Sequence, residues 1–152
     1  MCHLANLLMG IGLLQHRPTL VGMSVLWSLL GAPLWIRELF LEPCRPSSYL
    51  AHVVGLGVSL WALPGYRRSP SVWRQALALG VAVRALCWWV TPAALNVNVS
   101  HAMRDGWEQV FSAFWQYWLA STLAMGALLY VVDRVVRLGE RHDRGSGKDP
   151  AP

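Results

Sequence analysis

Residues 110–132, VFSAFWQYWLASTLAMGALLYVV, form an apolar run of 23 residues that contains no charged side chain. About 20 residues of α-helix cross the hydrocarbon core of a bilayer. Transmembrane barrel strands are only about half as long, because they span with about 10 residues each. This segment therefore predicts a transmembrane helix, and the rest of the chain must fold around that constraint.

Three further apolar runs have nearly the same length. They cover residues 20–36, which contain Pro33, residues 49–65, which end at Pro64-Gly65, and residues 72–90. Charged residues make up only 14% of the chain and gather between the runs, whereas soluble domains carry about 25%. We therefore expect an all-α membrane protein, a compact bundle of four full transmembrane helices.

The N-terminal residues 4–15 are apolar but too short to span, and no basic segment precedes them as in a secretory signal. We interpret them as a truncated fifth span, with a half-helix at the interface as the alternative. Residues 1–138 then form a single transmembrane domain. Residues 139–152 are polar and rich in Gly, Pro and charge, which predicts a disordered cytoplasmic tail.

The distribution of Lys and Arg predicts the orientation, because cytoplasmic loops carry the excess of positive charge. Nine of these residues fall on the side that includes the 66–71 loop and the C-terminus, and three fall on the opposite side. The C-terminus is therefore predicted to be cytoplasmic, while the 37–48 and 91–109 loops face outward. Which membrane holds the protein does not follow from the sequence.

Each full span carries small or polar residues four positions apart, a spacing that places them on one helix face. Small residues let helices approach closely in lipid, so we expect the four stripes to face inward. The stripes are Ser24/Ser28/Ala32, Ala51/Gly55/Ser59, Ala76/Gly80/Arg84 and Glu108/Ser112/Gln116/Ala120/Ala124.

Arg84 is the strongest candidate for a functional residue, because an arginine at mid-membrane costs between about 2.5 and 17 kcal/mol. We expect Gly80, one turn away, to leave room for its side chain, with Glu108 as first candidate partner and Glu42 as second. The other polar groups share the outer depth of the bundle. The candidate ligand-binding set is Arg84, His52, Gln116, Glu108, Asn96, Asn98 and His101.

The outer loop contains the sequence LNVNVSH at residues 95–101, which alternates apolar and polar side chains. Period-two alternation predicts an extended segment with two distinct faces. We expect its apolar face to lie on the mouth of the bundle and its asparagines to face water or the cavity.

The cysteines and histidines form no zinc-binding pattern, and no metal site is predicted. Two membrane histidines can ligate a haem, so His52 with His3 or His101 is the one cofactor arrangement considered, and no cofactor is predicted. A nucleic-acid partner is not expected, because no basic stripe lies on a soluble surface.

The favoured function is a small membrane protein whose outward-facing polar pocket binds or transports a small anionic or amphipathic ligand. A structural or assembly subunit of a larger membrane complex is the first alternative, and a membrane-embedded enzyme is the second. The expected partners are the lipid bilayer and either a second copy of the chain or another membrane protein.

Overall fold

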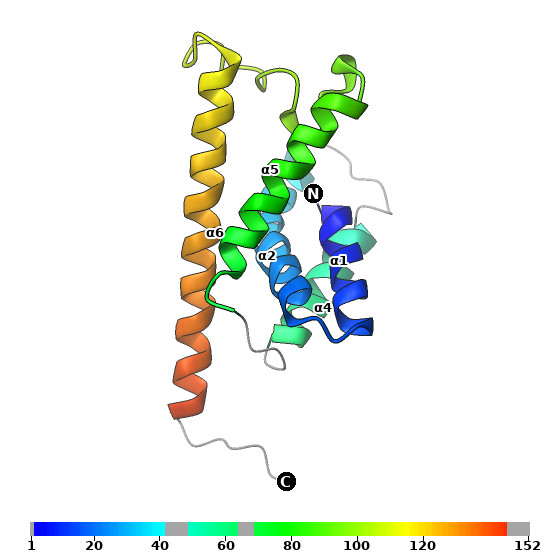
Figure 1. Ribbon diagram of the computed structural model, residues 1–152, viewed down its shortest axis with the longest axis vertical. Coiled ribbons are helices and arrows are strands. Elements are labelled where there is room, and N and C mark those ends of the chain that lie inside the picture. Colours follow the sequence, from blue (N-terminus) through cyan, green and yellow to red (C-terminus); the bar gives the residue numbers. More distant parts are fainter. Residues whose placement is uncertain (1, 42–48, 64–68, 146–152) are drawn as a thin grey trace.

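The computed structural model describes residues 2–41, 49–63 and 69–145 (Figure 1). Within these ranges every regular element is helical and there is no strand, which confirms the predicted all-α class. The elements are α1 (Cys2–Leu14), α2 (Pro18–Leu41), the π-helical turn η1 (Leu50–Val54), α4 (Gly55–Ala62), α5 (Val72–Val90), the 3₁₀ turns η3 (Ala93–Leu95) and η4 (Val97–Val99), and α6 (Phe114–Gly145).

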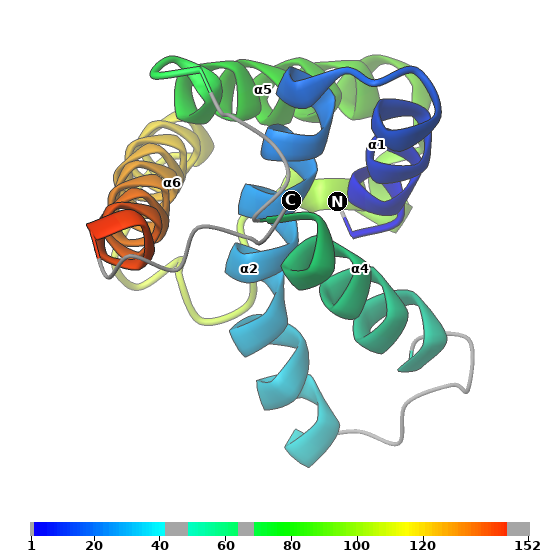
Figure 2. The same ribbon diagram turned by 90° about the horizontal axis from the view of Figure 1, so that it is seen from below.

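Helix α2 is the centre of the fold. Every residue from Val21 to Trp27 is buried, as in a helix that is covered on all sides. It packs against α1, α4, α5 and α6. Seen from below, α2 lies between α6 and the α1/α4 pair, and α5 runs along a third side (Figure 2). Helix α6 is viewed nearly end-on there while α2 lies across the view, so α2 crosses α6 steeply.

The first two helices form a tight hairpin. The Ser24 hydroxyl donates to the carbonyl of Ala5 at 2.5 Å, which joins two buried positions. A Cβ on Gly12 would lie 2.9 Å from Val21 Cγ2, so the glycine allows the backbones to approach. Small residues therefore bring α1 and α2 together, as they do in membrane helix pairs generally.

Helix α5 packs on α2 through its predicted stripe. Ala76, Gly80 and Arg84 are all buried, which confirms the inward face of this helix. The Trp27 indole donates to the carbonyl of Ala76 at 3.2 Å, and a Cβ on Gly80 would lie 2.6 Å from Trp27 Cζ2. Gly80 thus makes room for the Trp27 ring, and the expectation that it accommodates Arg84 is wrong.

Helix α6 uses a different face from the predicted one. Ala124 is exposed and Ala120 only half-buried, whereas Tyr117, Leu129 and Asp133 are buried. The inward stripe is therefore displaced by one residue. Three of its buried positions carry large or charged side chains, whereas the small residues four apart lie on the neighbouring face.

The two ends of α6 also differ from the sequence expectation. The helix begins at Phe114 instead of residue 110, and it continues to Gly145, beyond the span end at 132 and into the segment predicted to be disordered. Near that end Arg137 donates to Asp133 Oδ2 at 2.7 Å and to the Ser69 carbonyl at 2.5 Å. The bond to Ser69 ties α6 to the segment before α5.

Two of the described helices are long and apolar enough to cross a membrane, by length and composition: Pro18–Arg37 and Phe114–Gly139. Only 39% and 17% of their most apolar stretches are buried within the chain. Helix α1 and the η1–α4 segment are apolar but shorter, and the predicted end of the latter at Pro64-Gly65 lies outside the described residues.

Candidate functional site: a buried arginine and a separate apolar pocket

Arg84 projects from α5 toward α6 and the loop that joins the two helices, and 7% of its surface is exposed. Its Nε donates to the carbonyl of Val99 at 3.0 Å, and its Nη1 donates to the Ser121 hydroxyl at 2.8 Å. The guanidinium carbon lies 5.3 Å from the centroid of the Trp118 ring and 6.0 Å from that of Tyr117. Each hydrogen bond to a charged group contributes about 1.5–3 kcal/mol, and desolvated cation–π contacts add to this.

No carboxylate of the described residues pairs with Arg84. Its Nη2 is buried without a hydrogen-bond partner, and both hydrogen-bonded nitrogens use neutral acceptors. Glu108 is exposed, so the expected Arg84–Glu108 pair is wrong, and the second candidate, Glu42, lies outside the described residues. A backbone carbonyl and a serine on α6 hold the arginine instead.

The loop over Arg84 has an unusual backbone. Asn96, Asn98 and Val99 adopt positive φ angles of 39°, 54° and 55°, and two 3₁₀ turns replace the extended segment predicted for LNVNVSH. Asparagine tolerates the left-handed region, but a β-branched valine does not. Such a residue costs about 1–3 kcal/mol of strain, and here its carbonyl is the one that accepts from Arg84.

The predicted loop residues stabilise the loop itself. Asn96 Oδ1 accepts from the backbone N–H groups of His101 and Ala102 at 2.9 and 3.0 Å. The His101 Nε2 lies 3.3 Å from the Thr91 hydroxyl. Asn98 Nδ2 donates to the sulfur of Cys87 at 3.3 Å. These side chains are engaged within the chain and do not line an open cavity together.

Gln116 has a local role at the start of α6. Its Oε1 accepts from the backbone N–H and the hydroxyl of Ser112, at 3.1 and 2.9 Å. The side chain thus binds the residue four positions earlier, just before the helix begins at Phe114. Gln116, one of the predicted ligand-binding residues, thus bonds to the segment just before the first turn of α6 in this structure.

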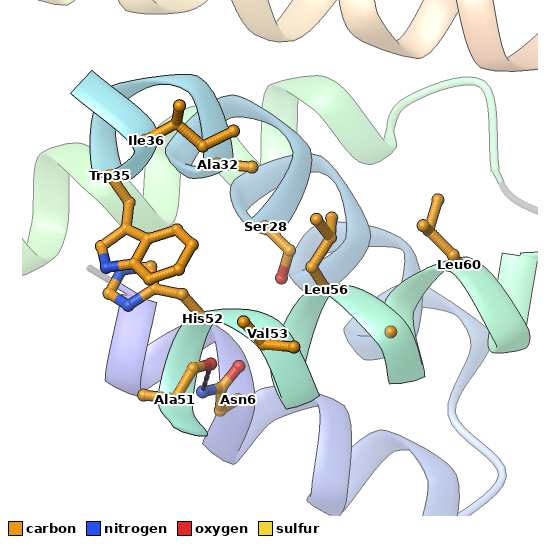
Figure 3. Close-up of a pocket in the computed structure, with 11 residues that line it drawn as sticks. Asn6, Ser28, Ala32, Trp35, Ile36, Ala51, His52, Val53, Leu56 and Leu60 are labelled. Atoms are coloured by element: carbon orange, nitrogen blue, oxygen red, sulfur yellow. Dashed lines mark hydrogen bonds between the residues drawn. The ribbon is translucent and has the colours of Figure 1, made fainter. Parts of the chain in front are cut away.

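His52 lies in a different part of the molecule, in a pocket between α1, α2 and the η1–α4 segment (Figure 3). The pocket has a volume of about 240 Å³. Apolar side chains make most of its wall, and three polar residues, Asn6, Ser28 and His52, join them. Its lining residues are Asn6, Ser28, Ala32, Trp35, Ile36, Ala51, His52, Val53, Leu56, Gly57 and Leu60.

The rings of His52 and Trp35 stack face to face at one side of this pocket. Their centroids are 4.9 Å apart and their planes differ by 3° (Figure 3). Asn6 of α1 donates to the carbonyl of Ala51 at 2.8 Å, and Gly55 leaves space for its amide. His52 and Asn6 are therefore held in place by neighbours, as expected of residues that would orient a ligand.

The predicted site residues thus fall into separate places. The pocket includes His52 and none of the other six candidates, and the contacts of Arg84 include none of them directly. The sequence reasoning missed Trp35, Asn6 and Ser28 at the pocket, and Ser121 and Val99 at Arg84. Trp35 and His52 each lie a few residues from the outer end of their predicted spans, a shared depth that could have paired them.

Among the described residues, no group of three or more His, Cys, Asp or Glu side chains could hold a metal ion. Of the three rings considered for haem ligation, two have partners in separate regions, His52 on Trp35 and His101 on Thr91. Comparisons with protein-family models, curated proteins and solved structures find no match to this chain.

Proposed function

We propose that the chain is a multi-pass membrane protein in which α2, the η1–α4 segment, α5 and α6 cross the bilayer. Support comes from the large apolar side chains that remain exposed along these helices, including Trp61, Trp89 and Leu123 at 65–79% exposure. Monomeric soluble proteins rarely expose contiguous apolar surface on this scale. Helix α6 has 32 residues and is therefore about 48 Å long. This length exceeds the thickness of the hydrocarbon core, so with a cytoplasmic C-terminus its end projects from the inner face of the membrane.

The function that the geometry supports best is the binding of a small amphipathic ligand in the His52 pocket. The observation that carries it is a pocket of about 240 Å³ whose apolar wall holds three polar residues, of which Asn6 and His52 are fixed by neighbours. Small-molecule sites generally combine apolar walls with a few placed polar groups. None of the described residues that line this pocket carries a charged side chain, so the pocket favours an uncharged or weakly polar headgroup over an anion.

The proposed orientation fits a ligand with one polar end. His52 and Trp35 lie toward the outer ends of their helices, while Leu56 and Leu60 follow deeper along α4. A ligand would place its polar group at His52 and Asn6 and its apolar part along α4. The volume corresponds to about eight water-sized groups, which suits a short single chain.

Photo-crosslinking tests this proposal in lipid nanodiscs, using a single-chain alcohol of medium length with a diazirine in its chain. We expect crosslinks on the 28–36 and 51–60 segments. Gly57 lines the pocket and has open space where a Cβ would lie, so Gly57→Leu should fill the pocket and remove most of the crosslinking.

The matched control is Gly10→Leu, since Gly10 is also a helical glycine with open space around it and does not line the pocket. It should crosslink like the parent. Equal crosslinking in the Gly57→Leu and Gly10→Leu proteins, or crosslinks spread evenly over the lipid-facing helices, would refute binding in this pocket.

Assembly with a partner through Arg84 is less well supported. The arginine is 7% exposed and its bonded donors face α6 and the loop, so a partner's side chain would have to displace the covering turn to reach it. Assembly through another face would be detected by obligate copurification with a second protein.

A further inference from the structure

The charge of Arg84 has no counter-ion among the residues that the structure describes. A guanidinium stays protonated in proteins, so the site carries a full positive charge against a carbonyl, a hydroxyl and two aromatic rings. An anion would add the attraction between opposite charges to these hydrogen bonds. The present neutral acceptors do not supply that attraction.

Two buried polar groups here also lack a hydrogen-bond partner. They are Arg84 Nη2 and the hydroxyl of Ser100, which follows directly on the residue whose carbonyl accepts from Arg84. Ser100 is 2% exposed. Buried unpaired polar groups are uncommon and indicate a missing partner or a functional role, and both of these groups can donate to an anion.

The third observation is the strain in the covering turn. Val99, with φ of 55°, presents to Arg84 the carbonyl that an anion would displace. Strained residues persist only where their surroundings hold them and are concentrated at ligand clamps and switches. Release of the Val99 carbonyl would relax the turn, and the anion would pair with the charge of Arg84. Both effects favour the exchange of the carbonyl for an anion.

From these three observations we infer that Arg84 is a binding site for a small monovalent anion, of chloride or small-carboxylate size, which displaces the Val99 carbonyl. Arg84 and the Ser100 hydroxyl supply the donors, and Ser121 keeps the guanidinium in place from α6. The 97–100 turn is the internal substitute for the anion when the site is empty. This site is independent of the His52 pocket.

Cys87 provides a reporter for the displacement. It is 9% exposed, and Asn98 of the same turn donates to its sulfur. With Cys2→Ser and Cys44→Ser, Cys87 is the single thiol of the chain. We would measure the rate of its reaction with N-ethylmaleimide in nanodiscs, titrating chloride against gluconate at constant ionic strength. Acetate forms a second arm, and glutathione reports any salt effect on the reagent.

If the anion binds only when the turn is open, labelling should rise in a saturable way, by about tenfold at ten times the dissociation constant. Arg84→Gln should abolish the dependence on chloride. Labelling that is unchanged or slowed by chloride and acetate in the parent, or the same chloride dependence in Arg84→Gln, would overturn the inference.

A second variant keeps the test decisive if Arg84→Gln does not fold. Val99→Asn retains the carbonyl but places a residue that tolerates positive φ at the strained position. It should slow labelling by about fivefold at every chloride concentration, which corresponds to relief of about 1 kcal/mol. Labelling as fast as in the parent would contradict a strained turn that the anion releases.

Discussion

The Arg84 region and the His52 pocket hold polar groups at similar predicted depths but are built in opposite ways. At Arg84 the guanidinium is 7% exposed, bonded to α6 and to the loop, and covered by a turn with a strained valine. At His52 the polar groups are fixed at the edge of a pocket that is already about 240 Å³ in volume. One region is closed by its own backbone, and the other is open.

This difference shows that the free-energy cost of burying a polar residue does not indicate whether the residue lines a binding site. The charge of Arg84, which is expensive to bury, is packed against the Val99 carbonyl, the Ser121 hydroxyl and two aromatic rings, so most of its surroundings are filled. The less costly groups Asn6, Ser28 and His52 leave space between α1, α2 and α4. The residue that is most costly to bury is therefore a poor guide to where an open cavity lies.

The largest effect should come from removing the arginine. Without Arg84 the strained turn loses its anchor, so Arg84→Leu should speed maleimide labelling of Cys87 by about ten- to hundredfold in chloride-free buffer, as expected for a lost hydrogen bond to a charged group. His52→Leu should leave the rate unchanged, because it alters only the pocket. If His52→Leu changed the labelling rate as strongly as Arg84→Leu does, the two regions would be coupled and not independent.

A double-mutant cycle gives the next largest effect. The Arg84–Ser121 hydrogen bond predicts a coupling of about 1.5–3 kcal/mol in the free energy of unfolding between Arg84→Leu and Ser121→Ala.

The matched cycle of Arg84→Leu with Glu108→Gln should be additive within about 0.5 kcal/mol, since Glu108 is exposed and makes no pair with Arg84. The opposite ranking of the two couplings would restore Glu108 as the partner of the arginine.

The face of α6 that belongs to the Arg84 region can be tested by a pair of valine substitutions. A Cβ on Gly126 would lie 3.0 Å from Leu77 Cδ2 of α5, so Gly126→Val should cost about 1–3 kcal/mol through overpacking. Ala124→Val, on the exposed face, should change the unfolding free energy by less than about 0.5 kcal/mol. Comparable losses in both variants would mean that α6 packs through both faces.

The sequence predicted much of the fold, because apolar runs and their breaks are visible in the chain. The helical class and the inward stripe of Ala76, Gly80 and Arg84 are confirmed. The start of α6 was placed four residues early, since Ser112 and its neighbours are apolar enough to extend the run yet precede the first helical turn.

The candidate site was harder to predict, for physical reasons that particular residues show. Arg84 is held by the carbonyl of Val99, and a backbone carbonyl leaves no mark in the sequence. Asn96 and Asn98 alternate with valines as in a strand, but asparagine's tolerance of positive φ favours turns instead. The pairing of His52 with Trp35 depends on how α2 and η1 meet, which hydropathy does not specify.

The central claim, that four helices cross the membrane and not two, is tested most directly by a reporter in the 66–71 loop. An enzyme domain active only in the cytoplasm would be inserted after Arg68, with fusions after Arg141 and at Pro46 as references. If α2, α4, α5 and α6 all cross, the insertions after Arg68 and Arg141 are active and the one at Pro46 is silent. If only the two longest apolar helices cross, the insertion after Arg68 is silent together with that at Pro46, and that result would contradict the account.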